Sequence, residues 1–461
     1  MKLDDIRQYF FKIDTSKNGV IENNEIEAAK QNSSIFNTVL EVGMNSDTYM
    51  QKAVNTFRDN IEIEDSNATK NLPYQLQPST EAQSLNWEPI TKILTKDEVD
   101  AKPFNINTAE NTPISKDLNF NNSDGEYMLK YLSFDDDTFK NTPAENLPKD
   151  FKPDEIIEKG RDAGCNTKAM HAMDYTGKGV KVAIIDTQIL TNHESIKSSI
   201  VGYEVMNNGL ANENEAYYHG QAVADILVGK EDGIAPDSKL VYFGAKCSGA
   251  GITADRLQAL RRIVEINKNS SPEDKIKVLS ISWDIDVERH GEQVYNEYNN
   301  LLKQLHDDGV FLSIAGGSML NKDINGVEMN YGGLEKKSQN GKPDDYSNYT
   351  GYSDFGFDNP LLIPAGDRTV ASARGENEYR HDSQCSTSWT VPALAGFYTC
   401  ALQCAKENGI ELTPAKFYEL AKETGQPIFN ENNEETGRAI DAKALCEKII
   451  ELAKSEHSFG V

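Results

Sequence analysis

The chain has 461 residues, more than one hydrophobic core usually organises, so two or three domains are expected. Apolar residues make up 38% and aromatic residues 8%, which is enough for a packed core and excludes a disordered chain. The formal net charge of −26 disfavours nucleic-acid binding, and no apolar run reaches membrane-spanning length, so neither kind of partner is expected.

The first ten residues carry acidic side chains where a secretory signal needs a basic segment followed by an apolar one. We therefore expect a cytoplasmic protein, or a secreted one if a leader precedes this sequence. The six cysteines form neither a CxxC pair nor a dense disulfide framework, which fits a reducing compartment.

Residues 1–32 predict a helix, a loop and a second helix, because apolar residues recur at helical spacing on both sides of a polar loop. Within this loop, oxygen donors fall at the spacing of an EF-hand, Gly19 occupies the sharp turn, and an acidic residue ends the loop. We expect bound Ca²⁺, the alternative being an empty relic. The predicted ligands are Asp14, Ser16, Asn18, Val20, Glu22 and Glu25.

Three regions follow from the changes in composition. Residues 1–65 are predicted as a small helical, EF-hand-containing module. Residues 66–158 are rich in Asn, Asp, Thr and Pro with few periodic segments, which indicates a linker or an intramolecular pro-segment that packs on another domain. Residues 159–461 are predicted as the catalytic domain.

Short, nearly all-apolar runs in this third region are typical of parallel strands buried on both faces. They alternate with helical patterns at 252–268 and 292–308, so we predict an α/β fold with a doubly wound, mostly parallel sheet flanked by helices. Two further helices are predicted to begin at Thr413-Pro414 and at Asp441. The predicted strands are 180–185, 239–243, 278–282 and 310–314.

Three polar residues lie after a predicted strand or at the start of a predicted helix, where sheets of this kind usually carry their functional residues. Asp186 follows the first buried strand, His219 opens a helix, and Ser388 lies at the predicted N-terminus of another helix, with Pro392 in the first turn. Each residue alone has a structural interpretation, as a hydrogen-bonded core carboxylate or a helix cap. Together they have the composition of a triad, in which a histidine accepts the serine proton and a carboxylate orients the histidine.

The segments around these residues resemble the catalytic blocks of the subtilase family, in the chain order of that family. The blocks are Ile184-Ile185-Asp186-Thr187, His219-Gly220-Gln221-Ala222-Val223-Ala224 and Thr387-Ser388-Trp389-Thr390-Val391-Pro392, with Gly233-Ile234-Ala235-Pro236 between them. The resemblance covers about 160–455. It implies hydrolysis of protein or peptide substrates through an acyl-enzyme, with Ser388 as nucleophile, His219 as general base and Asp186 orienting His219.

The sequence departs from the family pattern at Gln188, Gln221-Ala222, Ser386 and Trp389. The family also has an oxyanion-stabilising asparagine where this chain has Gly317, and the candidate replacements are Ser318 or another nearby donor such as Asn321. Losing one such donor costs about 3–4 kcal/mol in transition-state stabilisation. The alternative function is therefore a catalytically inactive subtilase fold that acts as a calcium-responsive binding protein.

Trp283 and Asp284 follow the predicted strand 278–282, where the family wall of the specificity pocket is usually rich in glycine. The two side chains are expected to narrow the pocket and to favour basic substrate side chains. The alternative is that Asp284 is a solvated surface residue.

Overall fold

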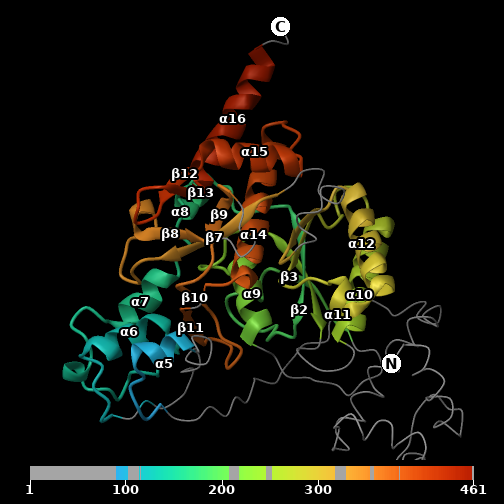
Figure 1. Ribbon diagram of the computed structural model, residues 1–461. Coiled ribbons are helices and arrows are strands. Elements are labelled where there is room, and N and C mark those ends of the chain that lie inside the picture. The colour runs from blue at the N-terminus through green and yellow to red at the C-terminus, as the bar shows by residue number, and fades with distance from the viewer. Residues whose placement is uncertain are drawn as a thin grey trace, which may run out of the picture.

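The computed structural model describes residues 90–101, 114, 116–206, 218–245, 252–316, 329–352, 358–383 and 385–458 (Figure 1). The predicted EF-hand module, with its calcium ligands from Asp14 to Glu25, lies outside the described residues, as do the oxyanion candidates Gly317 and Ser318.

The helices are α5 (Lys96–Ala101), α6 (Ser123–Tyr131), η3 (Ala144–Asn146), α7 (Pro153–Gly160), α8 (Thr167–His171), α9 (Tyr218–Val228), α10 (Ile252–Asn269), α11 (Val287–His290), α12 (Glu292–Asp307), η5 (Tyr346–Asn348), α14 (Thr387–Glu407), α15 (Pro414–Thr424) and α16 (Ala442–Ser458). The strands are β1 (Phe134–Asp135), β2 (Lys181–Thr187), β3 (Ile200–Val205), β4 (Lys239–Ala245), β5 (Val278–Ile281), β6 (Phe311–Ile314), β7 (Tyr331–Lys336), β8 (Tyr349–Tyr352), β9 (Leu361–Pro364), β10 (Arg368–Ala371), β11 (Tyr379–Asp382), β12 (Gln426–Phe429) and β13 (Glu435–Ala439).

A five-stranded sheet of order β3-β4-β2-β5-β6 forms the centre of the molecule, and all of its pairs are parallel. Helices α10 and α12 cover one face, while α9 and α14 cover the other (Figure 1). The apolar runs that predicted parallel strands correspond to β2, β4, β5 and β6, whose residues are almost all buried. The prediction of a doubly wound parallel sheet flanked by helices is confirmed for this part of the chain.

Two further sheets, one of five strands and one of three, flank the central one. A mixed sheet of order β12-β13-β9-β7-β8 lies on the far side of α14, which contacts its strands β7 and β9. An antiparallel sheet of order β1-β11-β10 precedes α14 in the chain, and its two longer strands form a hairpin. Strand β11 ends only a few residues before α14 begins, so the position of the hairpin affects the position of the first residues of that helix.

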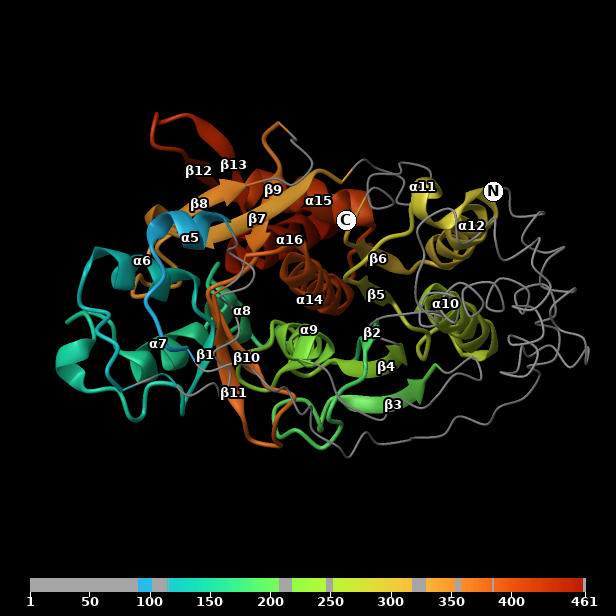
Figure 2. The same cartoon turned by 60° about the horizontal axis from the view of Figure 1, so that its bottom comes forward.

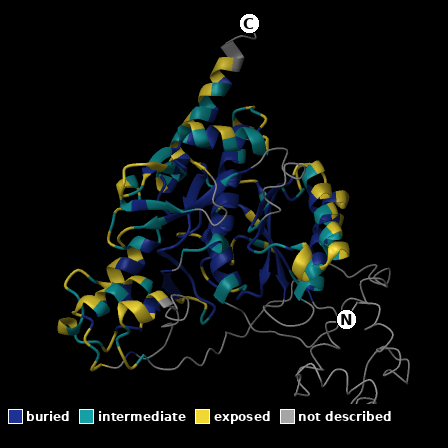
Figure 3. Ribbon diagram, in the orientation of Figure 1, coloured by how far each residue is buried: buried dark blue, intermediate teal, exposed yellow. Residues whose placement is uncertain are grey.

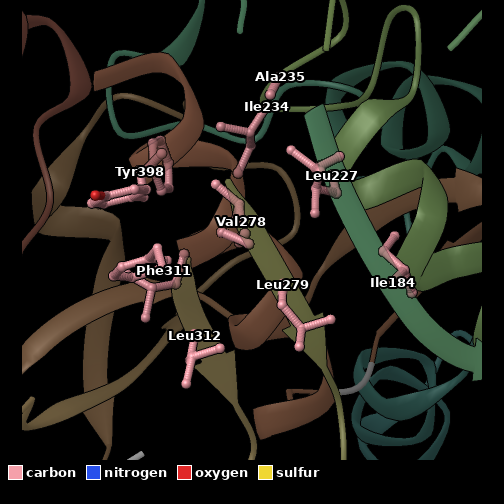
Figure 4. Packing of buried hydrophobic residues seen from close by; sticks show 14 of the residues in the cluster. Ile184, Leu227, Ile234, Ala235, Val278, Leu279, Phe311, Leu312 and Tyr398 are labelled. Atoms are coloured by element: carbon pink, nitrogen blue, oxygen red, sulfur yellow. The ribbon is translucent and has the colours of Figure 1, made fainter. Parts of the chain in front are cut away.

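Helix α14 is the buried axis of the domain. It contacts both five-stranded sheets and α9, and it is dark along most of its length when the chain is coloured by burial (Figure 3). Tyr398 of α14 stacks on Phe311 of β6, with ring centroids 3.9 Å apart and an angle of 7° between the rings. Figure 4 shows these two rings beside Val278 and Ile234. Gly396 allows α14 to lie close to Ile234, because a Cβ on Gly396 would lie 2.8 Å from the Cβ of Ile234.

Residues 116–161 form a lobe with helices α6 and α7 and a separate apolar core, at the lower left of Figure 1. We call this region the lobe; α5 packs against it. Its core includes a cluster of edge-to-face phenylalanine rings, in which Phe134, Phe139 and Phe151 have centroids 5.1–5.7 Å apart. Residues 116–158 of the lobe fall within the region predicted as a linker or pro-segment, and residues 159–161 lie at the start of the predicted catalytic domain. Removal of that region during maturation stays a prediction.

The described residues include no helix that is both long and apolar enough to cross a bilayer.

Helices α15 and α16 begin where their capping residues predicted. The Thr413 hydroxyl accepts from the backbone N–H of Lys416, and Asp441 accepts from the N–H of Ala444. These two helices pack on each other, and α16 also packs on α14.

Candidate active site

Asp186 is the penultimate residue of the central strand β2 and has only 3% of its side chain exposed. Its Oδ1 atom accepts hydrogen bonds from the backbone N–H of Thr187, at 2.7 Å, and from Nδ1 of His219, also at 2.7 Å. A buried carboxylate is stable only when it is hydrogen-bonded or paired with a charge. The two hydrogen bonds to Oδ1 supply such partners for Asp186.

His219 is the second residue of α9, and its side chain is 25% exposed. The residue that follows explains how the helix approaches β2 so closely. A Cβ on Gly220 would lie 2.2 Å from the carbonyl oxygen of Thr187 and 2.4 Å from the Tyr242 hydroxyl. The N–H of Gly220 donates to the Thr187 hydroxyl at 2.8 Å. Glycine at this position therefore lets the helix bring the imidazole to Asp186.

Ser388 is half-buried in the first turn of α14, as the sequence predicted. Pro392 lies beyond the first turn rather than within it, inside the helix. Because proline has no N–H, it cannot donate to the carbonyl four residues earlier, which is that of Ser388. The hydroxyl of Ser282, next to the end of β5, donates to this carbonyl at 2.9 Å instead. Pro392 thus frees the Ser388 carbonyl to be anchored to the sheet.

The structure packs the helix that carries Ser388 against the helix that carries His219. Helices α9 and α14 pack against each other and lie side by side in Figure 2. The ring of Trp389, which directly follows Ser388, lies 5.1 Å from the His219 ring with an angle of 32° between their planes. His219 also meets the Tyr218 ring edge to face, with centroids 6.2 Å apart. The imidazole therefore contacts two aromatic rings as well as Asp186.

Two opposing charges act on the imidazole. Burial disfavours charged His219, but the Asp186 carboxylate outweighs this effect, so the pKa of His219 is raised above its ordinary value. Arg256 of α10 acts against Asp186 and lowers the pKa of His219. The Arg256 guanidinium lies 4.2 Å from the centroid of the Trp283 ring, and burial lowers the pKa of Arg256 to about 10 despite the nearby Asp186. Sequence reasoning missed Arg256; the one signal for it was a basic residue near the start of a predicted helix.

Two departures from the expected motif have structural roles at the end of β2. Gln221 replaces a motif residue on α9, and its side-chain oxygen accepts from the N–H of Leu190 at 2.9 Å. This bond holds the chain that follows Asp186. Gln188 lies over Gly244 of the neighbouring strand β4, where a Cβ would come within 3.0 Å of the Gln188 side chain. Both glutamines thus pack on the chain around the end of β2.

Within the described residues, no group of three or more His, Cys, Asp or Glu side chains is placed to hold a metal ion. The predicted calcium ligands lie outside these residues, so calcium binding stays a prediction. The described part of the oxyanion block ends at Gly316, after β6. Its backbone approaches Asp284, because a Cβ on Gly316 would lie 2.4 Å from the Asp284 carboxylate.

The subtilase family model matches residues 177–426, more than half of the 461 residues, and this range contains Asp186, His219 and Ser388. The chain belongs to the subtilase family. It is 23% identical over 295 residues to serine protease AprX of Bacillus subtilis, a match that covers 56% of this chain and 65% of AprX. It is 24% identical over 316 residues to subtilisin-like protease 1 of Arthroderma gypseum, covering 64% of this chain and 61% of that protein.

The chain thus spans less than two thirds of the length of these two curated relatives. Among solved structures it is similar to the prenylagaramide maturation protease PagA, with 16% identity and a TM-score of 0.43 over 61% of this chain and 98% of PagA, a similarity too low to support an argument. In this subtilase the arrangement of Asp186, His219 and Ser388 suits activation of a hydroxyl nucleophile, because a neutral imidazole held by a carboxylate can accept the serine proton.

Asp186→Asn tests the electrostatic part of this site. The substitution removes the negative charge that raises the pKa of His219, so the imidazole loses its proton at lower pH. We expect the acidic limb of the pH profile of kcat/KM to move to lower pH, because catalysis needs the neutral base. We also expect kcat to fall by about 10⁴-fold. Steady-state kinetics on a peptide substrate measures both effects.

Asp174→Asn is the matched control, since Asp174 is exposed and its left-handed backbone (φ 69°) suits asparagine. It should leave the profile unchanged. An Asp186→Asn variant with an unmoved acidic limb and less than a tenfold loss of kcat would contradict the role of Asp186.

Proposed function

We propose that this subtilase is a serine endopeptidase that cleaves proteins or peptides through an acyl-enzyme on Ser388. The observation that carries the proposal is the 2.7 Å hydrogen bond between Asp186 and His219, beside the helix turn that presents Ser388. Family membership supports the same chemistry. It also favours an active protease over a catalytically inactive, calcium-responsive binding protein.

In the first half of the reaction, His219 accepts the Ser388 hydroxyl proton as the oxygen attacks the substrate carbonyl carbon. The tetrahedral intermediate collapses when the C–N bond breaks and His219 returns the proton to the leaving amine. In the second half, His219 deprotonates a water molecule that attacks the ester, and Ser388 regains its proton as the acid product leaves. Asp186 stays ionised throughout and stabilises the imidazolium.

The negative charge that develops on the substrate oxygen needs hydrogen-bond donors. Ser388 is the second residue of α14, so its backbone N–H has no intrahelical carbonyl four residues earlier to receive it. We propose that the Ser388 N–H is one donor, assisted by the positive end of the helix dipole. Gly317 and Ser318 remain the candidate positions for a second donor.

A fluorophosphonate probe, which reacts only with an activated serine, tests the proposal directly. We expect Ser388 to be labelled, and we expect Ser388→Ala to lose both labelling and about 10⁶-fold in casein turnover. Peptide mapping of the labelled chain identifies the modified residue.

Ser386→Ala is the matched control, because Ser386 precedes α14 and its side chain makes no cap hydrogen bond. This variant should keep the label. Casein turnover that persists in Ser388→Ala, or a label on another serine, would refute the assignment.

We further propose that the N-terminal loop Asp14–Glu25 binds Ca²⁺ and that calcium supports activity or stability. The support is the ligand spacing in the sequence, which matches the EF-hand loop at its oxygen donors and at Gly19. The proposed ligands are Asp14, Ser16, Asn18, Val20, Glu22 and Glu25.

Titration calorimetry tests the calcium site independently of catalysis. We expect wild-type protein to bind one Ca²⁺ at this loop and Glu25→Gln to lose that binding, because the last carboxylate supplies two ligand oxygens. Glu27→Gln, two residues beyond the loop, is the control and should bind as wild type. Equal binding by wild type and Glu25→Gln would remove the loop from the proposal.

The position of Asp284 leads to a proposal on specificity. Strands β5 and β6 are neighbours, and Asp284 beyond β5 lies against Gly316 beyond β6. Two residues before Asp284, the Ser282 hydroxyl donates to the Ser388 carbonyl, so the segment that follows β5 lies next to the helix turn that carries the nucleophile. We propose that this subtilase prefers lysine or arginine in the substrate residue whose carbonyl is attacked.

Substrates that differ only in this residue test the preference. We expect Asp284→Asn to reduce kcat/KM for an arginine substrate by about 10–100-fold, the effect of losing one charge-assisted hydrogen bond. The value for a matched leucine substrate should change by less than about threefold.

Asp286→Asn serves as the control. Asp286 caps α11 through the N–H of Arg289, and asparagine can form the same cap. An equal loss for both substrates in Asp284→Asn would show that Asp284 is structural.

A further inference from the structure

Strand β11 contacts both segments that carry the catalytic residues. It pairs with β10 on one side and with β1 of the lobe on the other, where Asp135 lies opposite Arg380 (Figure 2). The Arg380 guanidinium donates to Asp382 Oδ2 at 2.6 Å and lies 5.0 Å from the ring of Tyr218, which directly precedes His219. At its other end β11 leads into α14. A shift of β11 would therefore affect both His219 and Ser388.

Ser133 of the lobe, directly before β1, holds the end of β11. The backbone N–H of Ser383 donates to the Ser133 hydroxyl oxygen at 3.1 Å. The Ser133 hydroxyl lies 3.3 Å from Asp382 Oδ1 and 3.3 Å from the Ser383 hydroxyl. All three residues are buried, so water does not compete for these bonds. One side chain of the lobe thus fixes the chain just upstream of Ser388.

The lobe is attached at a second place through α7 and the residue after it. The Thr369 hydroxyl of β10 donates to the carbonyl of Ile157 at 2.5 Å, and Gly160 allows α7 to contact the same strand. Arg161 donates through Nη1 to both carboxylate oxygens of Asp232 at 3.1 Å, and its guanidinium lies 4.0 Å from the Tyr379 ring. The Asp232 side chain is fully buried. Without the lobe, this carboxylate would lose its ion-pair partner in the protein interior, although Arg368 of β10 still donates to the Asp232 backbone carbonyl.

We infer that the lobe is a permanent part of the active enzyme, and that Ser133 is a positioning residue that holds the strand leading to Ser388. The inference rests on the proposed protease function. Residues 116–161 are therefore not part of a removable pro-segment. If the protein is processed to its active form, these residues stay attached to the catalytic domain. Ser133 does not touch substrate; it acts through Asp382 and Ser383 on the position of the nucleophile.

Kinetics of Ser133→Ala, measured per labelled active site, tests the positioning role. We expect kcat to fall by about 10–100-fold, because a displacement of about 1 Å at a nucleophile has an effect of that order. KM should change by less than about twofold, and Ser133→Thr, which keeps the hydroxyl, should recover most of the loss. Ser123→Ala, exposed at the start of α6, is the control and should match wild type. Wild-type kcat in Ser133→Ala would overturn the positioning role.

The composition of the active wild-type species tests the permanence of the lobe. Full-length protein is labelled with a biotinylated fluorophosphonate, captured under native conditions and mapped by peptide mass spectrometry. We expect peptides from 116–161 in equal amount to the peptide that carries Ser388. A labelled species without the lobe would overturn the inference while leaving the protease function intact. Absence of any label on Ser388 would overturn the proposed function and, with it, this inference.

Discussion

The hydrogen bond between the buried carboxylate of Asp186 and the His219 imidazole is the interaction on which the rest of the site depends. A carboxylate at the end of a central parallel strand is costly to bury unless its partners are brought to it. Gly220 allows α9 to approach β2, and the amide of Gln221 holds the chain beyond Asp186. The packing around β2 therefore brings hydrogen bonds to Oδ1 of this carboxylate, whereas Oδ2 is buried with no hydrogen-bond partner among the described residues. The same arrangement leaves an imidazole able to accept a proton.

Ser388 is positioned in a different way: α14 lacks one of its backbone hydrogen bonds, and the carbonyl left without a donor attaches the helix to the sheet. Pro392 has no backbone N–H to donate inside α14, so the Ser388 carbonyl has no partner within the helix. The Ser282 hydroxyl donates a hydrogen bond to this carbonyl instead. The hydroxyl of Ser313 on β6 similarly donates to the carbonyl of Val391 at 2.8 Å. These two hydrogen bonds attach the start of α14 to the central sheet. The bonds from the lobe to β11 fix the hairpin that precedes the same helix.

Local patterns predicted the central sheet well because burial on both faces demands continuous apolar strands. The runs before Asp186 and at 278–282 are short, apolar and separated by helical patterns, a combination that is typical of a parallel sheet. The lobe escaped prediction because its helices are short and its core joins aliphatic side chains to aromatic rings such as Phe134 and Phe139, which contact one another without helical or strand periodicity. The Arg256–Trp283 contact was not predictable either, since it joins two elements across the edge of the sheet.

The sequence by itself determined the class of fold, the family resemblance and the three candidate catalytic residues, because motifs and periodicity are local properties of the chain. Only the tertiary structure decided which groups hold those residues in place. The Ser133–Ser383 bond joins residues 250 positions apart, and the Ser282–Ser388 bond joins residues 106 apart. Such contacts depend on how strands and helices pack in three dimensions, and no local pattern of residues specifies them.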